Sequence, residues 1–399
     1  MKKKWRTLLI WTLVALLLQF GVYSYLDYKI AQVMNPSPTV ITNELEATIP
    51  GTDLENIQIS YAKDYLAYTQ DGVLKVYNLK SQKVIFEKAP EPNSGENMGV
   101  LNYQWLPDRN ALIYFYARKN PEPVTMVLVE PEPVAQPQVE HPNSEAPAPA
   151  PQPEPYYEER YNNPQLTDLY TLELPSSDEE TPPDDRYNRT LDNFPSGGQI
   201  EQMVFSTYTN LMYLVVRSDD NTQLLEIDVM KNVRTISKKG EDITNISVSD
   251  RYGTLFLDST LGSQKRILVL QGWERFTVDE NPNYVILGVR SGMVYLGEVR
   301  EGNLVKILGA KDKSDFSQPY DFASLWEGSL PYEDQRIIVG GEGQIISYDD
   351  SSAYVVSNGQ LDQIALDGEE VLISEDGAQL ISIRTVDGQT QVKLQPFKY

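Results

Sequence analysis

Short runs of β-branched and aromatic residues follow one another along most of the chain, separated by turns rich in Gly, Asp and Asn. The first set comprises residues 57–60, 65–68, 73–77 and 83–86, with Asp71-Gly72 as one of its turns. Apolar residues that alternate with polar ones between short turns are typical of antiparallel strands. We therefore expect this set to form a four-stranded meander.

The same unit returns along the chain. Residues 203–236 and 243–278 each hold four such runs, and 345–373 resembles the opening set, with Asn358-Gly359 as its turn. Further strands are expected between 279 and 343, without a clear grouping into sets. Repeated sheets of this size bury their faces against their neighbours. The pattern predicts an all-β fold, a β-propeller of about seven four-stranded blades, with six or eight as alternatives.

Three motifs carry a resemblance to a known superfamily. They are Trp105-Leu106-Pro107-Asp108 before 112–114, Ser374-Glu375-Asp376-Gly377 before 380–383, and residues 72–79. These stretches resemble blade motifs of the WD40/TolB superfamily of propellers. The looser TolB or dipeptidyl-peptidase type fits better than a true WD40 repeat, because Asn78 replaces the usual aspartate and no Gly-His pair precedes the strands. In the dipeptidyl-peptidase relatives the hydrolase is a separate domain with a Gly-x-Ser-x-Gly elbow, which this sequence lacks.

A proline-rich insert interrupts the second blade at about 119–165. Pro121 to Pro164 contains 12 of the 26 prolines, a composition that favours an extended, polyproline-like loop. Residues 166–174 are expected to return to the sheet. An acidic loop at about 176–198 is expected to leave it again.

The beginning of the chain predicts a membrane anchor. Residues 8–26 carry no charge and follow four basic residues, so 7–27 is expected to be a single transmembrane signal anchor after a cytoplasmic tail, 1–6. A cleaved signal peptide is the alternative. Residues 28–50 form a stalk with a possible closing strand, at Thr39–Thr42 or Glu44–Ile49, that would pair with 391–397. The extracytoplasmic propeller then spans 51–399.

Net charge narrows the range of partners. The whole chain carries −23, and removing the four N-terminal cations leaves 30 basic against 57 acidic residues, or −27, outside the membrane. Such a surface repels nucleic acid, so no nucleic-acid partner is expected. The expected partner is a protein of the cell envelope.

Residue types also narrow the chemistry. The chain has no cysteine and a single histidine, His141, so a thiolate nucleophile and a metal site built from several imidazoles are excluded. The adjacent acidic pairs Asp219-Asp220, Asp349-Asp350 and Glu369-Glu370 fall at predicted turns, where solvated carboxylates are usual. We expect no enzyme activity, no cofactor and no metal. An enzyme that uses channel carboxylates on a carbohydrate is one alternative.

An aromatic segment at 316–332 suggests a contact surface. Tyr320, Phe322 and Trp326 are the candidate binding residues, because large aromatic side chains are enriched at interfaces. Trp105 and Trp273 are expected in the core. The sequence thus predicts a non-enzymatic, membrane-anchored extracytoplasmic propeller that acts as a protein-binding scaffold or subunit of a cell-envelope assembly. A ligand sensor that signals through a membrane partner is a second alternative.

Overall fold

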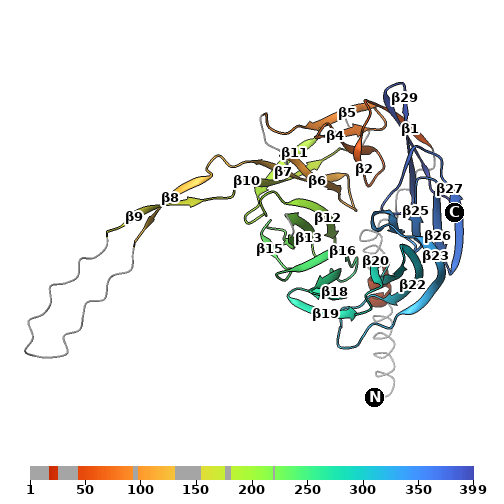
Figure 1. Ribbon diagram of the computed structural model, residues 1–399. Coiled ribbons are helices and arrows are strands. Elements are labelled where there is room, and N and C mark those ends of the chain that lie inside the picture. Colours follow the sequence, from red (N-terminus) through yellow and green to blue (C-terminus); the bar gives the residue numbers. More distant parts are fainter. Residues whose placement is uncertain (1–17, 26–43, 93–97, 131–153, 176–180, 219–220) are drawn as a thin grey trace, which may run out of the picture.

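Seven four-stranded antiparallel sheets stand around a central axis in the computed structural model of the chain (Figure 1). The structure describes residues 18–25, 44–92, 98–130, 154–175, 181–218 and 221–399. The all-β fold and the count of seven blades are therefore confirmed.

Each blade is an up-and-down meander whose first strand lies nearest the axis (Figure 1). Blade 1 contains β2 (Glu55–Ile59), β3 (Tyr65–Gln70), β4 (Val73–Asn78) and β5 (Lys83–Lys88). Blade 2 contains β6 (Gly99–Trp105), β7 (Ala111–Lys119), β10 (Gln165–Glu173) and β11 (Asp184–Thr190). Blade 3 contains β12 (Gln199–Ser206), β13 (Leu211–Ser218), β14 (Asn221–Ile227) and β15 (Val233–Thr235). Blade 4 contains β16 (Glu241–Val248), β17 (Leu255–Leu261), β18 (Gln264–Gln271) and β19 (Glu274–Asp279).

The strands between 284 and 365 form two blades, which settles the grouping that the sequence left open between 279 and 343. Blade 5 contains β20 (Tyr284–Arg290), β21 (Met293–Arg300), β22 (Asn303–Lys311) and β23 (Ala323–Pro331). Blade 6 contains β24 (Ile337–Val339), β25 (Ile345–Tyr348), β26 (Ser352–Ser357) and β27 (Gln360–Ala365), with the short 3-10 helix η1 (Asp334–Arg336) before it. The prediction that 345–373 forms one repeat was therefore wrong by one strand, since 370–373 already belongs to the last blade.

The last blade is completed by the beginning of the chain. Three of its strands are β28 (Glu370–Ile373), β29 (Gln379–Val386) and β30 (Gln389–Pro396), and the fourth is β1 (Leu45–Pro50). β1 and β30 are antiparallel, with Ala47 opposite Val392 and Ile49 opposite Thr390. This is the closing strand that the sequence placed at Glu44–Ile49; the other candidate, Thr39–Thr42, lies outside the described residues.

The hydrophobic core lies between neighbouring blades. Leu66 and Tyr77 of blade 1, for example, pack with Val392 and Leu394 of blade 7. Because each blade exposes two apolar faces, it is stable only where a neighbour covers both of them. Closure by β1 therefore protects the first and the last blade together.

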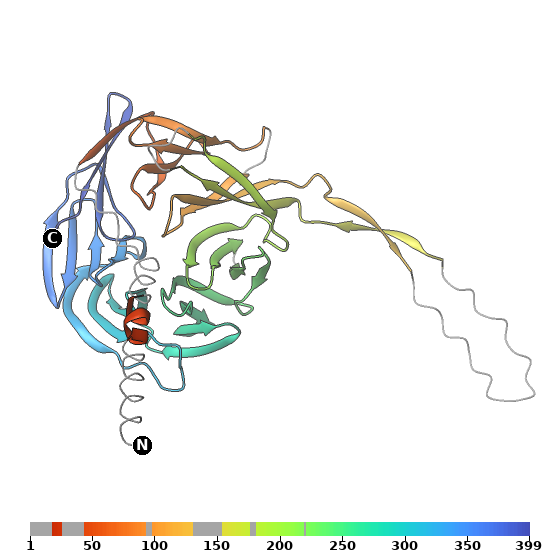
Figure 2. The ribbon, with the colours of Figure 1, turned by 180° about the vertical axis from the view of Figure 1, so that it is seen from behind.

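The insert in blade 2 contains a two-stranded ribbon that projects away from the disc (Figures 1 and 2). β8 (Val124–Val129) pairs with β9 (Tyr156–Tyr161), and we call these two strands the arm. The prediction of a polyproline-like loop over the whole insert was wrong here. The run Val-Thr-Met-Val-Leu-Val contains no proline and has high β propensity, so it pairs although prolines lie on both sides of it.

The predicted acidic loop at 176–198 also contains a strand, β11, which is the outermost strand of blade 2. Its carboxylates find partners within the disc: Asp185 accepts a hydrogen bond from the Tyr114 hydroxyl at 2.7 Å and lies 3.3 Å from the Lys88 ammonium. An outer strand has a paired neighbour on one edge only, and the side chains of β11 are exposed or half-buried. Such a strand does not need the apolar alternation that identifies inner strands.

Residues 18–25 are helical, but most of the predicted anchor at 7–27 lies outside the described residues. In the part of the chain that the structure describes, no helix has the length and apolar character needed to cross a membrane.

Candidate functional site: the central channel and the arm

Amide side chains connect the inner strands of successive blades. Each donates a hydrogen bond to a backbone carbonyl of the next inner strand, at 2.7–2.9 Å: Gln58 to Tyr103, Asn102 to Ile200, Gln202 to Thr244, and Asn245 to Ile286. The pairing register shifts next to each of these amides, as expected at a β-bulge. The bulge turns the amide sideways, toward the neighbouring blade.

This series of amides ends at blade 5, where Gly288 occupies the corresponding position on β20. A Cβ atom at Gly288 would lie 2.7 Å from Cγ2 of Val339, so blade 6 packs directly against the glycine. Blades 5 and 6 therefore approach each other without an amide between their inner strands.

Residues two positions after three of these amides line the channel. They are Gln104, Val204 and Ser247, and Arg290 has the same place after Gly288. Side chains alternate along a strand, so the wall position follows directly from the bulge position. The channel contains two pockets of about 240 and 300 Å³, and Arg290 and Glu375 line both of them.

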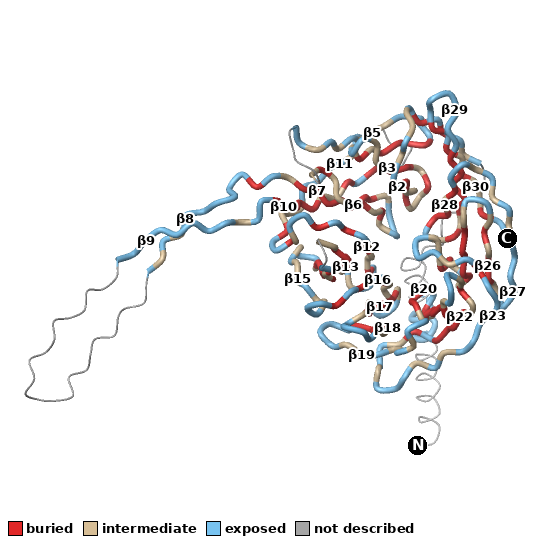
Figure 3. Tube along the Cα trace, in the orientation of Figure 1, coloured by how far each residue is buried: buried red, intermediate tan, exposed pale blue. Residues whose placement is uncertain are grey.

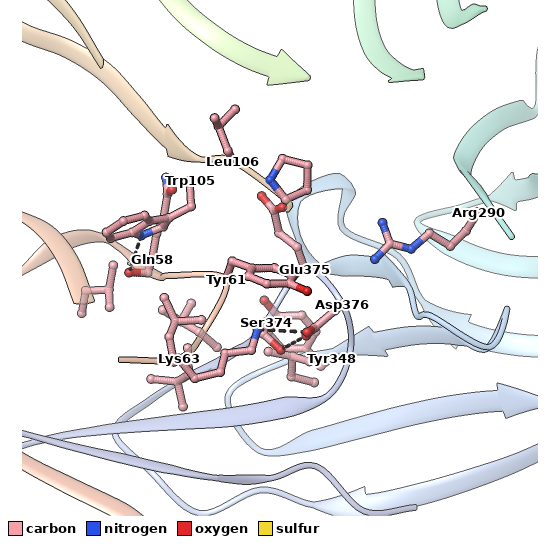
Figure 4. Close-up of a pocket in the computed structure, with 16 residues that line it drawn as sticks. Gln58, Tyr61, Lys63, Trp105, Leu106, Arg290, Tyr348, Ser374, Glu375 and Asp376 are labelled. Atoms are coloured by element: carbon pink, nitrogen blue, oxygen red, sulfur yellow. Dashed lines mark hydrogen bonds and ion pairs between the residues drawn. The ribbon is translucent and has the colours of Figure 1, made fainter. Parts of the chain in front are cut away.

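At one mouth of the channel, an ion pair connects blade 1 to blade 7 (Figure 4). The Lys63 ammonium lies 2.9 Å from the Asp376 carboxylate, and their side chains are 6% and 16% exposed. Asp376 also accepts hydrogen bonds from the Ser374 hydroxyl at 2.5 Å and the Ala378 N–H at 3.1 Å. Burial alone would raise the pKa of Asp376, but the Lys63 charge and these hydrogen bonds together lower it.

Glu375 extends into the channel from the same turn. It accepts a hydrogen bond from Gln104 of blade 2 at 2.9 Å. Water reaches this carboxylate inside the channel, yet protein surrounds it, and this burial raises its pKa despite the Gln104 hydrogen bond and the Arg290 and Lys63 charges. Arg290 points toward the side of the pocket that holds Glu375 (Figure 4), and its guanidinium has no hydrogen bond or ion pair with the described residues.

Adjacent carboxyl groups with pKa values shifted in opposite directions can serve as an acid and a base. Here, however, Asp376 is held by its turn and by Lys63, so its lowered pKa has a structural cause. Nor do three or more acidic or histidine side chains converge as metal ligands anywhere in the described ranges. What the mouth offers is a small pocket whose described lining includes one unpaired cation, Arg290, and one carboxyl group of raised pKa, Glu375.

The predicted binding residues lie apart from this channel. Trp326 is 8% exposed and packs in the core between blades 5 and 6. Tyr320 and Phe322 are half-buried in the connection between β22 and β23, where Tyr320 packs against Phe256 at 6.0 Å and Phe322 at 5.6 Å between ring centroids. Phe316, from the same connection, stacks on Phe276 of blade 4. These contacts join blades 4 and 5, and partner binding by Tyr320, Phe322 and Trp326 stays a prediction.

The other sequence candidates have mixed outcomes. Trp105 is 5% exposed, as predicted, but Trp273 is 76% exposed in the turn between β18 and β19, so its prediction as a core residue was wrong. Its ring stacks on the Arg234 guanidinium at 4.0 Å. A side chain in an exposed turn points into solvent even when it is hydrophobic. His141 and Asp219-Asp220 lie outside the described residues.

Of the remaining acidic pairs, Asp349-Asp350 lies in the turn between β25 and β26, whereas Glu369-Glu370 lies where β28 begins, with Glu370 as its first residue. Asp349 accepts hydrogen bonds from the Ser351 and Ser352 N–H groups at 2.7 and 2.8 Å, and Asp350 lies 2.7 Å from Arg336. The sequence analysis missed Glu375-Asp376 as a candidate pair. A sequence signal for this turn was nevertheless present, namely the serine that opens the turn after an inner strand. The same arrangement recurs in several blades, where the hydroxyl accepts a backbone N–H group: Ser60, Ser249 and Ser374.

The arm is the second candidate site. Its exposed apolar side chains are Val124 (42%), Met126 (55%), Leu128 (48%), Tyr156 (54%), Tyr157 (66%) and Tyr161 (76%). Figure 3 shows this ribbon as exposed along almost its whole described length. A monomeric surface seldom gathers so many large apolar groups unless they meet a partner.

No protein-family model and no curated protein sequence matches the chain. Solved structures similar to it include the β-propeller domain of Cps50 (Swd1) from Myceliophteria thermophila, with a TM-score of 0.48 over 88% of this chain and 99% of that one. The WD40 repeats of RRP9 give 0.47 over 88% and 98%, and TolB from Acinetobacter baumannii gives 0.39 over 89% and 80%. Identity is 10% in all three, and we draw no function from them.

Proposed function

We propose that the protein is a membrane-anchored, extracytoplasmic β-propeller without enzyme activity, which acts as a protein-binding scaffold or subunit of a cell-envelope assembly. The observation that carries this proposal is the arm. It holds apolar side chains in solvent at the end of a ribbon, whereas the disc buries most of its own between blades. Exposed apolar surface of this kind is a common feature of protein–protein interfaces.

The anchor rests on the sequence. A long uncharged segment after Lys2, Lys3, Lys4 and Arg6 is typical of a signal anchor with a cytoplasmic N-terminus. Leu18 and Phe20 of the described helical residues are 66% and 71% exposed, so no described part of the chain covers them. In a membrane-anchored chain, lipid would cover these two side chains.

Fractionation tests the anchor. The full chain should sediment with membranes and resist alkaline extraction, whereas a chain that begins at Glu44 should be soluble. Recovery of the full chain in the soluble fraction would refute anchoring.

Thiol labelling tests on which side of the membrane the propeller lies. The chain has no cysteine, so Lys239→Cys at an exposed turn gives a single thiol. A membrane-impermeant maleimide should label it in intact cells; labelling only after lysis would refute the extracytoplasmic placement.

Crosslinking of native membranes followed by mass spectrometry tests the scaffold role. We expect adducts between the propeller and one or a few envelope proteins, at a ratio that stays constant between preparations. A protein recovered without such adducts, at any crosslinker concentration, would contradict the scaffold role.

Glu375 favours one second candidate, a carboxylate enzyme acting on a carbohydrate. It lines both channel pockets, and burial raises its pKa, as a general acid needs. Turnover of glycan or lactone substrates that Glu375→Gln abolishes would establish this function in place of the scaffold. Glu158→Gln on the arm is the matched control.

A further inference from the structure

The two faces of the arm differ in chemistry. Residues directly opposite in an antiparallel pair point to the same side, and side chains alternate along each strand. The Met126 face therefore combines Val124, Met126 and Leu128 of β8 with Tyr161, Glu159 and Tyr157 of β9. The Val127 face combines Thr125, Val127 and Val129 with Arg160, Glu158 and Tyr156.

The Met126 face is the more apolar of the two. Apart from Glu159, whose carboxylate accepts a hydrogen bond from the Tyr161 hydroxyl at 3.1 Å, it consists of apolar and aromatic side chains, and each of these is at least 42% exposed. The Val127 face carries an arginine and a glutamate, and both of its valines are half-buried.

Hydrogen bonds at the base of the arm fix its attachment to the disc. The Asn120 N–H donates to Pro164 O at 2.8 Å, and the Asn162 N–H donates to Pro123 O at 2.9 Å. The Asn163 side chain donates to Phe194 O of the connection between blades 2 and 3, at 3.1 Å. The arm is therefore presented in a defined direction, which lowers the entropy that a partner must remove on binding.

Charge identifies the kind of partner. Residues 121–130 and 154–161 contain five exposed glutamates and a single basic residue, Arg160, which gives a net charge of 1 − 5 = −4. The glutamates are Glu122, Glu130, Glu154, Glu158 and Glu159. An apolar strip with an acidic border is complementary to an apolar groove with a basic border. A second copy of this chain, at −23 overall, and an anionic lipid surface would both be repelled.

We propose that the Met126 face of the arm docks into an apolar, lysine- or arginine-bordered groove on a different protein, and that the Val127 face stays in solvent. This inference rests on the scaffold function proposed above and adds the contact face and the chemistry of the partner.

Site-specific photo-crosslinking in the native cells tests the proposal. A photo-reactive amino acid at 128 or 157 samples the Met126 face, and one at 127 or 158 samples the Val127 face, in the full chain. We expect adducts to one protein from 128 and 157 alone, with lysine or arginine in or beside the crosslinked peptide. Equal adducts from both faces, adducts only to a second copy, or no adduct from 128 and 157 would overturn the proposal.

Matched variants give the energetic test. Met126→Ser with Leu128→Ser should lower the adduct yield from 157 about tenfold, the loss expected when an interface loses its main apolar contacts. Val127→Ser with Val129→Ser removes the same number of apolar residues from the other face and should leave the yield unchanged. Glu159→Lys should lower it, and added salt should lower it in the wild type. An equal effect of both double variants would overturn the face assignment.

Vesicles of phosphatidylcholine with phosphatidylglycerol provide the lipid control for a chain that begins at Glu44. Sedimentation with these vesicles that Met126→Ser with Leu128→Ser abolishes would show a lipid surface instead of a protein. If crosslinks form from the disc but none from the arm, the scaffold function stands and this inference fails.

Discussion

Two strand pairs, β1 with β30 and β8 with β9, have nearly the same length and opposite environments. In β1, Ala47 and Ile49 are 3% and 0% exposed, while in β8 Val124 and Met126 are 42% and 55% exposed. β1 and β8 each pair with one neighbouring strand, so pairing satisfies the backbone of each to the same extent. The difference shows that burial, and not strand pairing, separates a strand that stabilises the disc from one that is free to contact a partner.

Charged side chains differ between the disc and the arm in the same way as apolar ones. In the disc, Lys63 and Asp376 are mostly buried and hold each other, so each depends on its partner. On the arm, the carboxylates are exposed, and water solvates each of them. Substitutions of charged residues should therefore alter stability in the disc and binding at the arm.

Removal of β1 should have the largest effect on stability. A chain that begins at Gly51 loses the buried side chains of Ala47 and Ile49 and leaves β30 as an open edge. Loss of a fully buried Ile alone costs about 2–5 kcal/mol, so the melting temperature should fall by about 10 °C or more relative to a chain that begins at Glu44.

The register of β1 offers a second measurement. Thr48 lies opposite Gln391 on the exposed side of the pair, so Thr48→Cys with Gln391→Cys should oxidise readily. Thr48→Cys with Gln395→Cys is the out-of-register control. Equal melting of the two truncated chains, together with no bond at Gln391, would show that β1 does not close the ring.

Lys63→Met should cause the second largest loss of stability, about 3 kcal/mol, because it leaves Asp376 buried without its cation. Adding Asp376→Asn should restore much of the loss. Folding lowers the pKa of Asp376 below its usual 3.8, so its contribution is present above that pH and is lost as pH falls through the folded-state value. Chemical denaturation should therefore show the wild type and Lys63→Met converging in strong acid; a constant difference would exclude the ion pair as the cause.

Asp258→Asn should stabilise the disc at alkaline pH. Asp258 is 2% exposed, and burial raises its pKa to about 7. The folded protein therefore binds a proton that the unfolded chain has released, and wild-type stability falls as pH rises from about 4 to 7. The variant should be more stable by roughly 4 kcal/mol at pH 8 and little more stable at pH 4. Asn keeps an acceptor for the Ile286 N–H, which lies 3.0 Å from Asp258.

Glu158→Gln on the exposed arm is the control for this comparison and should show no such dependence. A gain in stability from Asp258→Asn that does not depend on pH would mean that packing, and not ionisation, limits stability between blades 4 and 5.

Removal of the arm should have the smallest effect on stability. Pro123 and Asn162 are already hydrogen-bonded at its base, so a short Gly-Ser link can replace 124–161 without strain. The melting temperature should change by less than about 2 °C, since exposed side chains contribute little to folding. A fall beyond about 5 °C would show that the arm packs on the disc. The same variant should lose the arm crosslinks.

Much of the fold could be predicted from local pattern. Alternation in 73–77 and the Asp71-Gly72 turn identify strands because strand geometry depends on residues one or two positions apart. The closing strand was predicted because 44–49 had strand character and no neighbour to pair with. β11 was missed because an outer strand can be polar, and β8 because the prolines on either side dominated the composition of the insert.

The candidate site was much less predictable. Trp326 was predicted as a binding residue and Trp273 as a core residue, yet Trp326 is 8% and Trp273 is 76% exposed. Glu375 has a raised pKa because protein from distant parts of the chain buries it, whereas Gln104 and Arg290, also far away in the sequence, act in the opposite direction. No pattern within one segment contains that information.

By itself, then, the sequence determined most strands and turns and indicated about seven blades closed by a strand from the beginning of the chain, since backbone geometry and short-range alternation are local properties. Only the tertiary structure decided which carboxylates share the channel mouth and which apolar side chains stay in solvent on the arm. Burial and electrostatic environment arise from contacts between residues far apart in the chain, and the closed ring of blades is what brings those residues together.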